Sequence, residues 1–242
     1  MNHTVDYYFA PQSPWAYLGH QRLADIAQRQ GASVRVMPMD LGGKVFPISG
    51  GLPLGQRAPQ RQAYRLVELQ RYSEHLGVPL QLKPKYFPVS GDDAARLIIA
   101  ADLAEGSGAA MRLAGAVLAA CWAQERNIAD DKALLQLLAE QGRPAALLER
   151  SHSQAVQERY DAYTQAAIDA GVFGKLVNAE ANISRDRLGK IDLNSWRYTA
   201  AGMPGGVMLQ IGIHYADVLE YLMGPVKAVN GRFAQLVLPG DN

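Results

Sequence analysis

The first forty residues change between two hydrophobic periodicities. Residues 4–9 (TVDYYF) alternate apolar and polar side chains, which predicts a β-strand. From residues 15–27 the apolar positions recur at steps of three and four, which predicts a helix. Ser13 suits the N-cap of that helix, Pro14 suits its first turn, and Gly31 suits its C-terminal end.

A second alternating segment, residues 33–39 (SVRVMPM), predicts another strand. Strand, helix and strand in this order favour a parallel pair joined by a right-handed crossover. A Gly/Pro-rich connection at residues 42–59 comes next, and the periodicity is helical from there on. The apolar spacing predicts helices around residues 66–76, 92–103, 107–124, 130–141 and 153–170.

The pattern changes again after Gly174, where we place the main boundary of the chain. Residues 176–184 are strand-like, residues 208–223 have a helical period, and residues 226–238 predict a final strand or hairpin. The expected domains are a core formed by residues 1–41 and about 150–174, a helical insert at residues 42–150, and a separate segment at residues 175–242.

Composition narrows the class of protein. The 242 residues are 48% hydrophobic, which is enough for a large core, and 24 Lys+Arg against 23 Asp+Glu leave a net charge of +1. A nucleic-acid-binding protein would have a more unequal charge balance. Apolar runs stay short of the roughly 18 residues that a membrane span needs, and the first residues do not resemble a secretion signal. We expect a cytoplasmic protein that binds neither nucleic acid nor membrane.

Cys121 is the single cysteine of the chain. One cysteine excludes an intramolecular disulfide, a CxxC redox pair and a cysteine-built zinc site, and we expect no metal. Because Cys121 lies in an apolar helical stretch, we expect an inert core thiol. His20, further along the first helix, either approaches the same pocket as Ser13 or lies at the surface, and we expect the surface position.

The turn SPWAYL at residues 13–18, directly after the DYYF strand, resembles the DsbA-related family of 2-hydroxychromene-2-carboxylate isomerases and kappa-class glutathione transferases. The similarity ends at Gly174. It also includes MDLG at residues 39–42, RYSEHLGVP at 71–79, FP at 87–88 and ERYD at 158–161.

This resemblance implies a thioredoxin-like fold with a helical insert, in which Ser13 hydrogen-bonds the sulfur of bound glutathione. A hydroxyl at a helix N-terminus is suited to this role, because the helix dipole and the first N–H groups favour a thiolate. The chemistry implied is addition of that thiolate to the substrate, bond rotation and elimination. Ala16 stands where a thioredoxin carries its second cysteine, so dithiol exchange is excluded.

The resemblance also suggests a small aromatic carboxylate as substrate, and a homodimer. Trp15 either lines a flat aromatic pocket or packs on the helix face. Lys83 and Lys85, in the sequence KPKYFP, either attract a carboxylate of substrate or glutathione or belong to a solvated loop. The predicted site is therefore Ser13 as the catalytic residue, with Ser13, Trp15, Lys83 and Lys85 binding glutathione.

After Gly174 the family pattern would continue with Val-Pro-Thr and Trp-Gly-x-Asp-Arg-Leu segments, which are missing here. Residues 175–242 instead resemble part of the C-terminal domain of Gfo/Idh/MocA oxidoreductases. His214 matches the histidine of that family's Asp-x-Gly-x-His segment, but Gln210 stands at the aspartate position. The chain has no Gly-x-Gly-x-x-Gly unit, so it cannot form a nicotinamide dehydrogenase by itself.

The predicted fold class is therefore α/β: a thioredoxin-like, DsbA-type βαβ core with an inserted all-helical domain, truncated and followed by a foreign α+β segment. A glutathione-dependent isomerase is the leading functional hypothesis. The alternatives are an impaired or non-catalytic fusion of the two fragments, a kappa-type glutathione S-transferase, and an accessory piece of an oxidoreductase.

Overall fold

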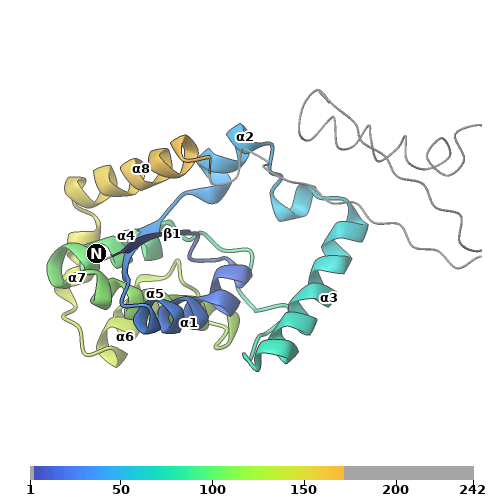
Figure 1. The fold of residues 1–242 in the computed structure, drawn as a ribbon, viewed down its shortest axis with the longest axis horizontal. Helices are drawn as coiled ribbons and strands as arrows, with labels where there is room; N and C mark the ends of the chain where they lie inside the picture. The colour runs from blue at the N-terminus through green and yellow to red at the C-terminus, as the bar shows by residue number, and fades with distance from the viewer. Residues whose placement is uncertain (1–2, 172–242) are drawn as a thin grey trace, which may run out of the picture. The chain divides into compact units, whose positions relative to one another are not determined.

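The computed structural model describes residues 3–171 (Figure 1). The chain divides into two units, Met1–Gly174 and Lys175–Asn242, and all described residues lie in the first. The strands and the helix expected beyond Gly174 fall outside the described residues, as do His214 and Gln210.

The chain begins with a parallel βαβ unit, as the sequence predicts. Strands β1 (Thr4–Phe9) and β2 (Ser33–Pro38) pair in parallel, with Thr4 opposite Ser33 and Phe9 opposite Pro38. Helix α1 (Pro14–Arg29) connects them. Gly31 follows the helix with a φ of +62°, a conformation that glycine adopts without strain.

Both faces of the strand pair are covered. On one face Phe9 and Val36 join the main apolar cluster, which helices α4 (Asp92–Glu105) and α5 (Ser107–Trp122) supply with most of its residues. On the other face Tyr8 and Met37 pack against α8 (Gln154–Asp169). Figure 1 shows α8 on one side of β1 and α1 and α5 on the other.

The five predicted helices are confirmed. Besides α4, α5 and α8 they are α3 (Pro59–Leu76) and α6 (Asp131–Glu140). Helix α3 begins seven residues earlier than expected, and the other boundaries move by at most two. Sequence periodicity did not identify the shorter helical elements, because three to six residues carry too little of a helical period. These are η1 (Leu41–Val45), α2 (Phe46–Ser49), η2 (Leu54–Gln56) and α7 (Ala146–Ser151).

Helices α4 and α5 are rich in Ala and Leu and are buried on most of their surface. Neither these nor any other helix within residues 3–171 is both long and apolar enough to cross a membrane.

Candidate active site

Ser13 is the N-cap of α1, as predicted, and its side chain is half-buried. Its Oγ accepts a hydrogen bond from the Ala16 N–H at 3.2 Å. That bond uses an acceptor position of the hydroxyl, so the O–H remains free to donate. Within the described residues the Trp15 N–H also has no acceptor. Two hydrogen-bond donors are therefore available at the positive end of the α1 dipole.

The turn that carries Ser13 is fixed by α5. The indole N–H of Trp122, at the end of α5, donates to the Gln12 carbonyl oxygen at 3.2 Å. Trp122 is fully buried, and its ring lies 4.7 Å from that of Phe87, centroid to centroid. A Cβ at Gly91 would come within 2.0 Å of the Gln12 Oε1 atom, so the turn packs directly against this glycine. The position of Ser13 thus depends on contacts far from it in the sequence.

Trp15 projects from the first turn of α1 and is 42% exposed. Its ring meets that of Tyr72 on α3 edge to face, at 5.6 Å between centroids. This contact links α3 to the N-terminal end of α1 and leaves much of the indole accessible. An exposed aromatic residue beside Ser13 agrees with a ligand-facing role, which stays a prediction.

Arg65 of α3 is a site residue that the sequence reasoning missed. Its guanidinium carbon lies 5.3 Å from the centroid of the Phe87 ring and 5.6 Å from that of Trp122. Desolvation lowers the pKa of Arg65, and the nearby charge of Arg57 lowers it further. A sequence signal exists, because buried Leu69 and then Tyr72 follow Arg65 at helical spacing and mark the inward face of α3.

We call Ser13, Trp15, Arg65, Phe87 and Trp122 the Ser13 site. The set joins the N-terminus of α1 to α3, to the end of α5 and to the loop before α4. It combines two free hydrogen-bond donors, aromatic surfaces and one partly buried cation. Chemically, such a set can hold an anion at the helix end and bind a flat ring with a negative group.

Lys83 and Lys85 lie on the exposed loop that leads to Phe87. The Lys85 ammonium stands 5.2 Å from the centroid of its neighbour's ring, Tyr86, and its backbone N–H donates to Glu125 at 3.2 Å. No contact joins either lysine to Ser13. Their role in binding glutathione stays a prediction.

His20 is not at the surface, so that expectation was wrong. It is only 7% exposed, and its Nε2 lies 3.0 Å from the Met111 carbonyl oxygen while its Nδ1 lies 3.3 Å from the Tyr7 hydroxyl. Periodicity could not reveal this burial, because α5 passes over α1 at this point. A neutral ring with an N–H on Nε2, donating to Met111 and accepting from Tyr7, satisfies both nitrogens.

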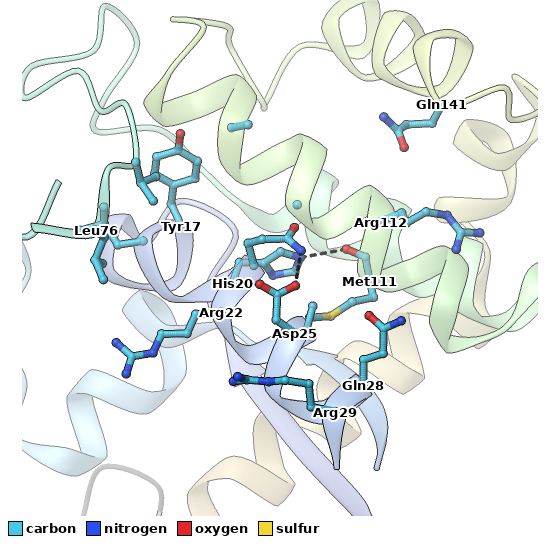
Figure 2. Close-up of a pocket in the computed structure, with 16 residues that line it drawn as sticks. Tyr17, His20, Arg22, Asp25, Gln28, Arg29, Leu76, Met111, Arg112 and Gln141 are labelled. Atoms are coloured by element: carbon cyan, nitrogen blue, oxygen red, sulfur yellow. Dashed lines mark hydrogen bonds between the residues drawn. The ribbon is translucent and has the colours of Figure 1, made fainter. Parts of the chain in front are cut away.

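His20 lines the floor of a cavity of about 1030 Å³ between α1 and α5 (Figure 2). Figure 2 shows Arg22 and Arg112 at the edges of this cavity with their guanidinium groups turned away from His20. His20, the buried polar side chain here, already has protein partners for both ring nitrogens. The cavity therefore offers a ligand no free buried polar group, and the chemistry stays at the opposite end of α1.

Cys121 is buried in α5, as predicted. Desolvation raises the pKa of its thiol to about 12, so the thiolate is scarce at neutral pH. Cys121 is an inert core residue.

The parallel strand pair, the capped α1 and the helical block define the class of protein. A family model described as a DSBA-like thioredoxin domain matches residues 4–175. The predicted fold class, a DsbA-type thioredoxin-like core with inserted helices, is therefore confirmed. A second model, that of the GFO/IDH/MocA C-terminal domain, matches residues 162–241. Both resemblances read from the sequence are thus found independently.

Curated relatives identify the family within this fold class. The 2-hydroxychromene-2-carboxylate isomerase of Pseudomonas putida is 32% identical over 173 residues, which cover 70% of this chain and 81% of the relative. The enzyme of the same name from Sphingobium xenophagum is 27% identical over 175 residues, covering 72% and 87%. The chain belongs to the 2-hydroxychromene-2-carboxylate isomerase family of DsbA-like thioredoxin domains. At the level of the family, this is an isomerase.

Solved structures agree with this assignment. A selenomethionine structure of 2-hydroxychromene-2-carboxylate isomerase has a TM-score of 0.59 at 26% identity, covering 89% of this chain and 98% of that one. The cytosolic disulfide reductase DsbM from Pseudomonas aeruginosa, solved with GSH, has a TM-score of 0.54 at 18% identity, covering 71% and 82%. The second likeness concerns the fold alone.

Proposed function

We propose that this chain is a glutathione-dependent isomerase that acts on small aromatic carboxylates of the 2-hydroxychromene-2-carboxylate type. The single observation that carries the proposal is the free Ser13 hydroxyl donor at the N-terminus of α1, inside a fold whose relatives bear that enzyme's name. The relative solved with GSH supports glutathione as the thiol.

The described residues fit the thiol end of glutathione. Glutathione supplies a sulfur nucleophile for reversible addition to the substrate. Ser13 donates its O–H to that sulfur, and the Trp15 N–H and the α1 dipole add to the positive potential there. These groups favour the thiolate over the thiol and so lower the pKa of the bound sulfur. Ser13 acts as an electrostatic stabiliser and does not itself bond to the substrate.

The remaining residues of the proposed site orient the substrate and attract anions. The exposed face of Trp15 offers a surface for a planar ring. Lys83 and Lys85, exposed on the loop that leads to Phe87, add long-range attraction for anions. A cytoplasmic location is part of this proposal, because the lone cysteine is a buried free thiol and DsbM is by its name cytosolic.

Disulfide reduction, the activity in the name of DsbM, is not supported by the residues present. The position three after Ser13 is Ala16, and the one cysteine of the sequence is Cys121, buried in α5. No thiol of this chain is available at the N-terminus of α1.

The proposal is tested with Ser13→Gly, because glycine is nearly as good an N-cap as serine and costs only a few tenths of a kcal/mol. Loss of a hydrogen bond to a reacting anion lowers kcat by about 10²-fold or more. We expect that loss in isomerisation of 2-hydroxychromene-2-carboxylate with glutathione, together with a higher pKa of bound glutathione, followed by thiolate absorbance.

Ser13→Thr is the matched control, since it keeps a hydroxyl at the cap, and it should retain most of the activity. Wild-type protein that binds no glutathione at millimolar concentration would overturn the proposal in favour of a non-catalytic fusion. Equal turnover of wild type and Ser13→Gly would remove Ser13 from the mechanism.

A further inference from the structure

Arg65 carries a positive charge at a partly desolvated position of α3. It is half-buried, and within residues 3–171 its guanidinium has neither an ion-pair nor a hydrogen-bond partner. The neighbouring charge is Arg57, which is of the same sign. By contrast, the partly buried Arg96 and the buried Arg143 each have a carboxylate partner, Asp93 and Glu105.

An arginine in this position needs compensation. Removing a charge from water is costly unless it is paired, and a second cation nearby adds to that cost. The Phe87 and Trp122 rings, at 5.3 and 5.6 Å, supply cation–π attraction, which offsets part of that cost. The rings cannot use the five N–H donors of the guanidinium, whose planar fork matches a carboxylate. A carboxylate bound here would use these donors and neutralise the charge.

The position of Arg65 connects it to Ser13. Its guanidinium lies over the Trp122 ring, and the indole N–H of that ring holds the carbonyl of Gln12, the residue before Ser13. Further along α3, Tyr72 contacts Trp15 in the first turn of α1. Helix α3 therefore runs past the N-terminus of α1 with Arg65 on its inward face. Trp122 therefore contacts both the guanidinium of Arg65 and the turn that carries Ser13.

We propose that Arg65 is the specificity-determining residue that binds the carboxylate of the aromatic substrate, with the substrate ring directed toward Ser13. This rests on the proposed function, which it extends by naming the carboxylate anchor. The exposed indole of Trp15, beside Ser13, offers a face for a flat ring next to that carboxylate. Glutathione also has carboxylates, so the experiment separates the two sources.

The probes are chromone-2-carboxylate, a planar aromatic carboxylate, and its neutral carboxamide, each titrated calorimetrically without glutathione. Arg65→Gln should weaken binding of the carboxylate about tenfold or more, as expected when a charge-assisted bidentate pair is lost. It should leave binding of the carboxamide and of glutathione within about twofold of wild type. Arg61→Gln, at an exposed arginine one turn earlier on α3, is the matched control and should change none of these affinities.

Arg65→Lys keeps the charge but loses the planar fork, so its carboxylate affinity should be intermediate. It also tests the proposal if Arg65→Gln fails to fold. Unchanged carboxylate binding in both variants, or a loss confined to glutathione, would overturn the proposal.

The two proposals fail separately. Wild-type protein that binds chromone-2-carboxylate through Arg65 but binds no glutathione would leave this inference standing and remove the proposed function. Ser13-dependent turnover with no effect of Arg65→Gln on substrate KM would do the reverse.

Discussion

Helix α1 carries polar groups in two settings, which differ in whether the hydrogen-bonding capacity of these groups is used by the protein. At its N-terminus, the Ser13 hydroxyl and the Trp15 N–H have donors that no described residue accepts, and no carboxylate within residues 3–171 pairs with Arg65. Two turns later, His20 is more deeply buried, yet both of its ring nitrogens have protein partners. Burial of a polar residue therefore does not by itself mark a site. Unused hydrogen-bonding capacity at a partly buried position does.

The same contrast shows that a cavity is not by itself a binding site. A cavity of about 1030 Å³ lies beside His20, whose two ring nitrogens already have protein partners. The Ser13 site is defined instead by unused hydrogen-bond donors and the exposed indole of Trp15. Removing Ser13 should affect chemistry by about 10²-fold, whereas changes near His20 should affect stability. The following predictions test that division, from the larger effects to the smaller.

His20→Ala is expected to destabilise the fold by about 2–3 kcal/mol, because the Tyr7 hydroxyl and the Met111 carbonyl lose their partner in a buried place. Urea denaturation measures this loss. Glutathione affinity and kcat of the folded fraction, assayed at low temperature, should stay within about twofold of wild type. A large fall in kcat would show that the two settings on α1 are not independent.

The pH dependence provides a control for that variant. Desolvation lowers the pKa of His20 below 6.5, although its hydrogen bond to Met111 opposes this. Below pH 6.5 the unfolded chain therefore takes up a proton at His20 more readily than the folded protein. The free energy of unfolding should fall with decreasing pH, by at most about 1.4 kcal/mol per pH unit, and His20→Ala should lack this component.

Gly115→Ala tests how closely α5 packs on His20. A Cβ at Gly115 would lie 3.0 Å from the Nε2 atom of a ring that two hydrogen bonds hold in place. Overpacking should exceed the gain in helix propensity, for a net loss of about 1 kcal/mol in the free energy of unfolding. Gly19 on α1 has open space around its Cβ position, so Gly19→Ala should stabilise by about 0.5–1 kcal/mol. Equal effects of both substitutions would show that the packing is looser than described.

Replacing both Lys83 and Lys85 by Gln should have the smallest effect. Both are exposed, so they act on anions through screened long-range attraction. Glutathione binding should weaken by less than about threefold at low salt, and the difference should vanish at about 0.5 M salt. A tenfold, salt-independent loss would show that one lysine makes a fixed contact with glutathione.

Local features of the fold could be predicted because each depends on neighbouring residues. The alternation of TVDYYF, the cap at Ser13 and the left-handed turn at Gly31 are properties of a few consecutive side chains. The inert Cys121 was also predictable, because its surroundings in the sequence are uniformly apolar. The short helix α7 was not, since six residues show less than two helical turns.

The candidate site could be predicted only in part. Ser13 and Trp15 belong to one local motif, so the motif identifies both. Arg65 and Trp122 reach the site from helices far along the chain, and only their packing brings them to Gln12. The cluster KPKYFP drew attention to Lys83 and Lys85 through its charge, although exposed charges are usually solvated.

The sequence by itself determined the βαβ start, the helix cap at Ser13, the exclusion of dithiol chemistry and the resemblance to two families. These follow from short-range periodicity, from the steric preferences of single residues and from the absence of a second cysteine. Tertiary structure alone decided which polar groups are satisfied: His20 lies between Tyr7 and Met111, and Arg65 lies over two rings with no carboxylate partner in the described part of the chain. The physical reason is that hydrogen bonding and desolvation depend on which helices cross in space, and spacing along the chain does not encode that crossing.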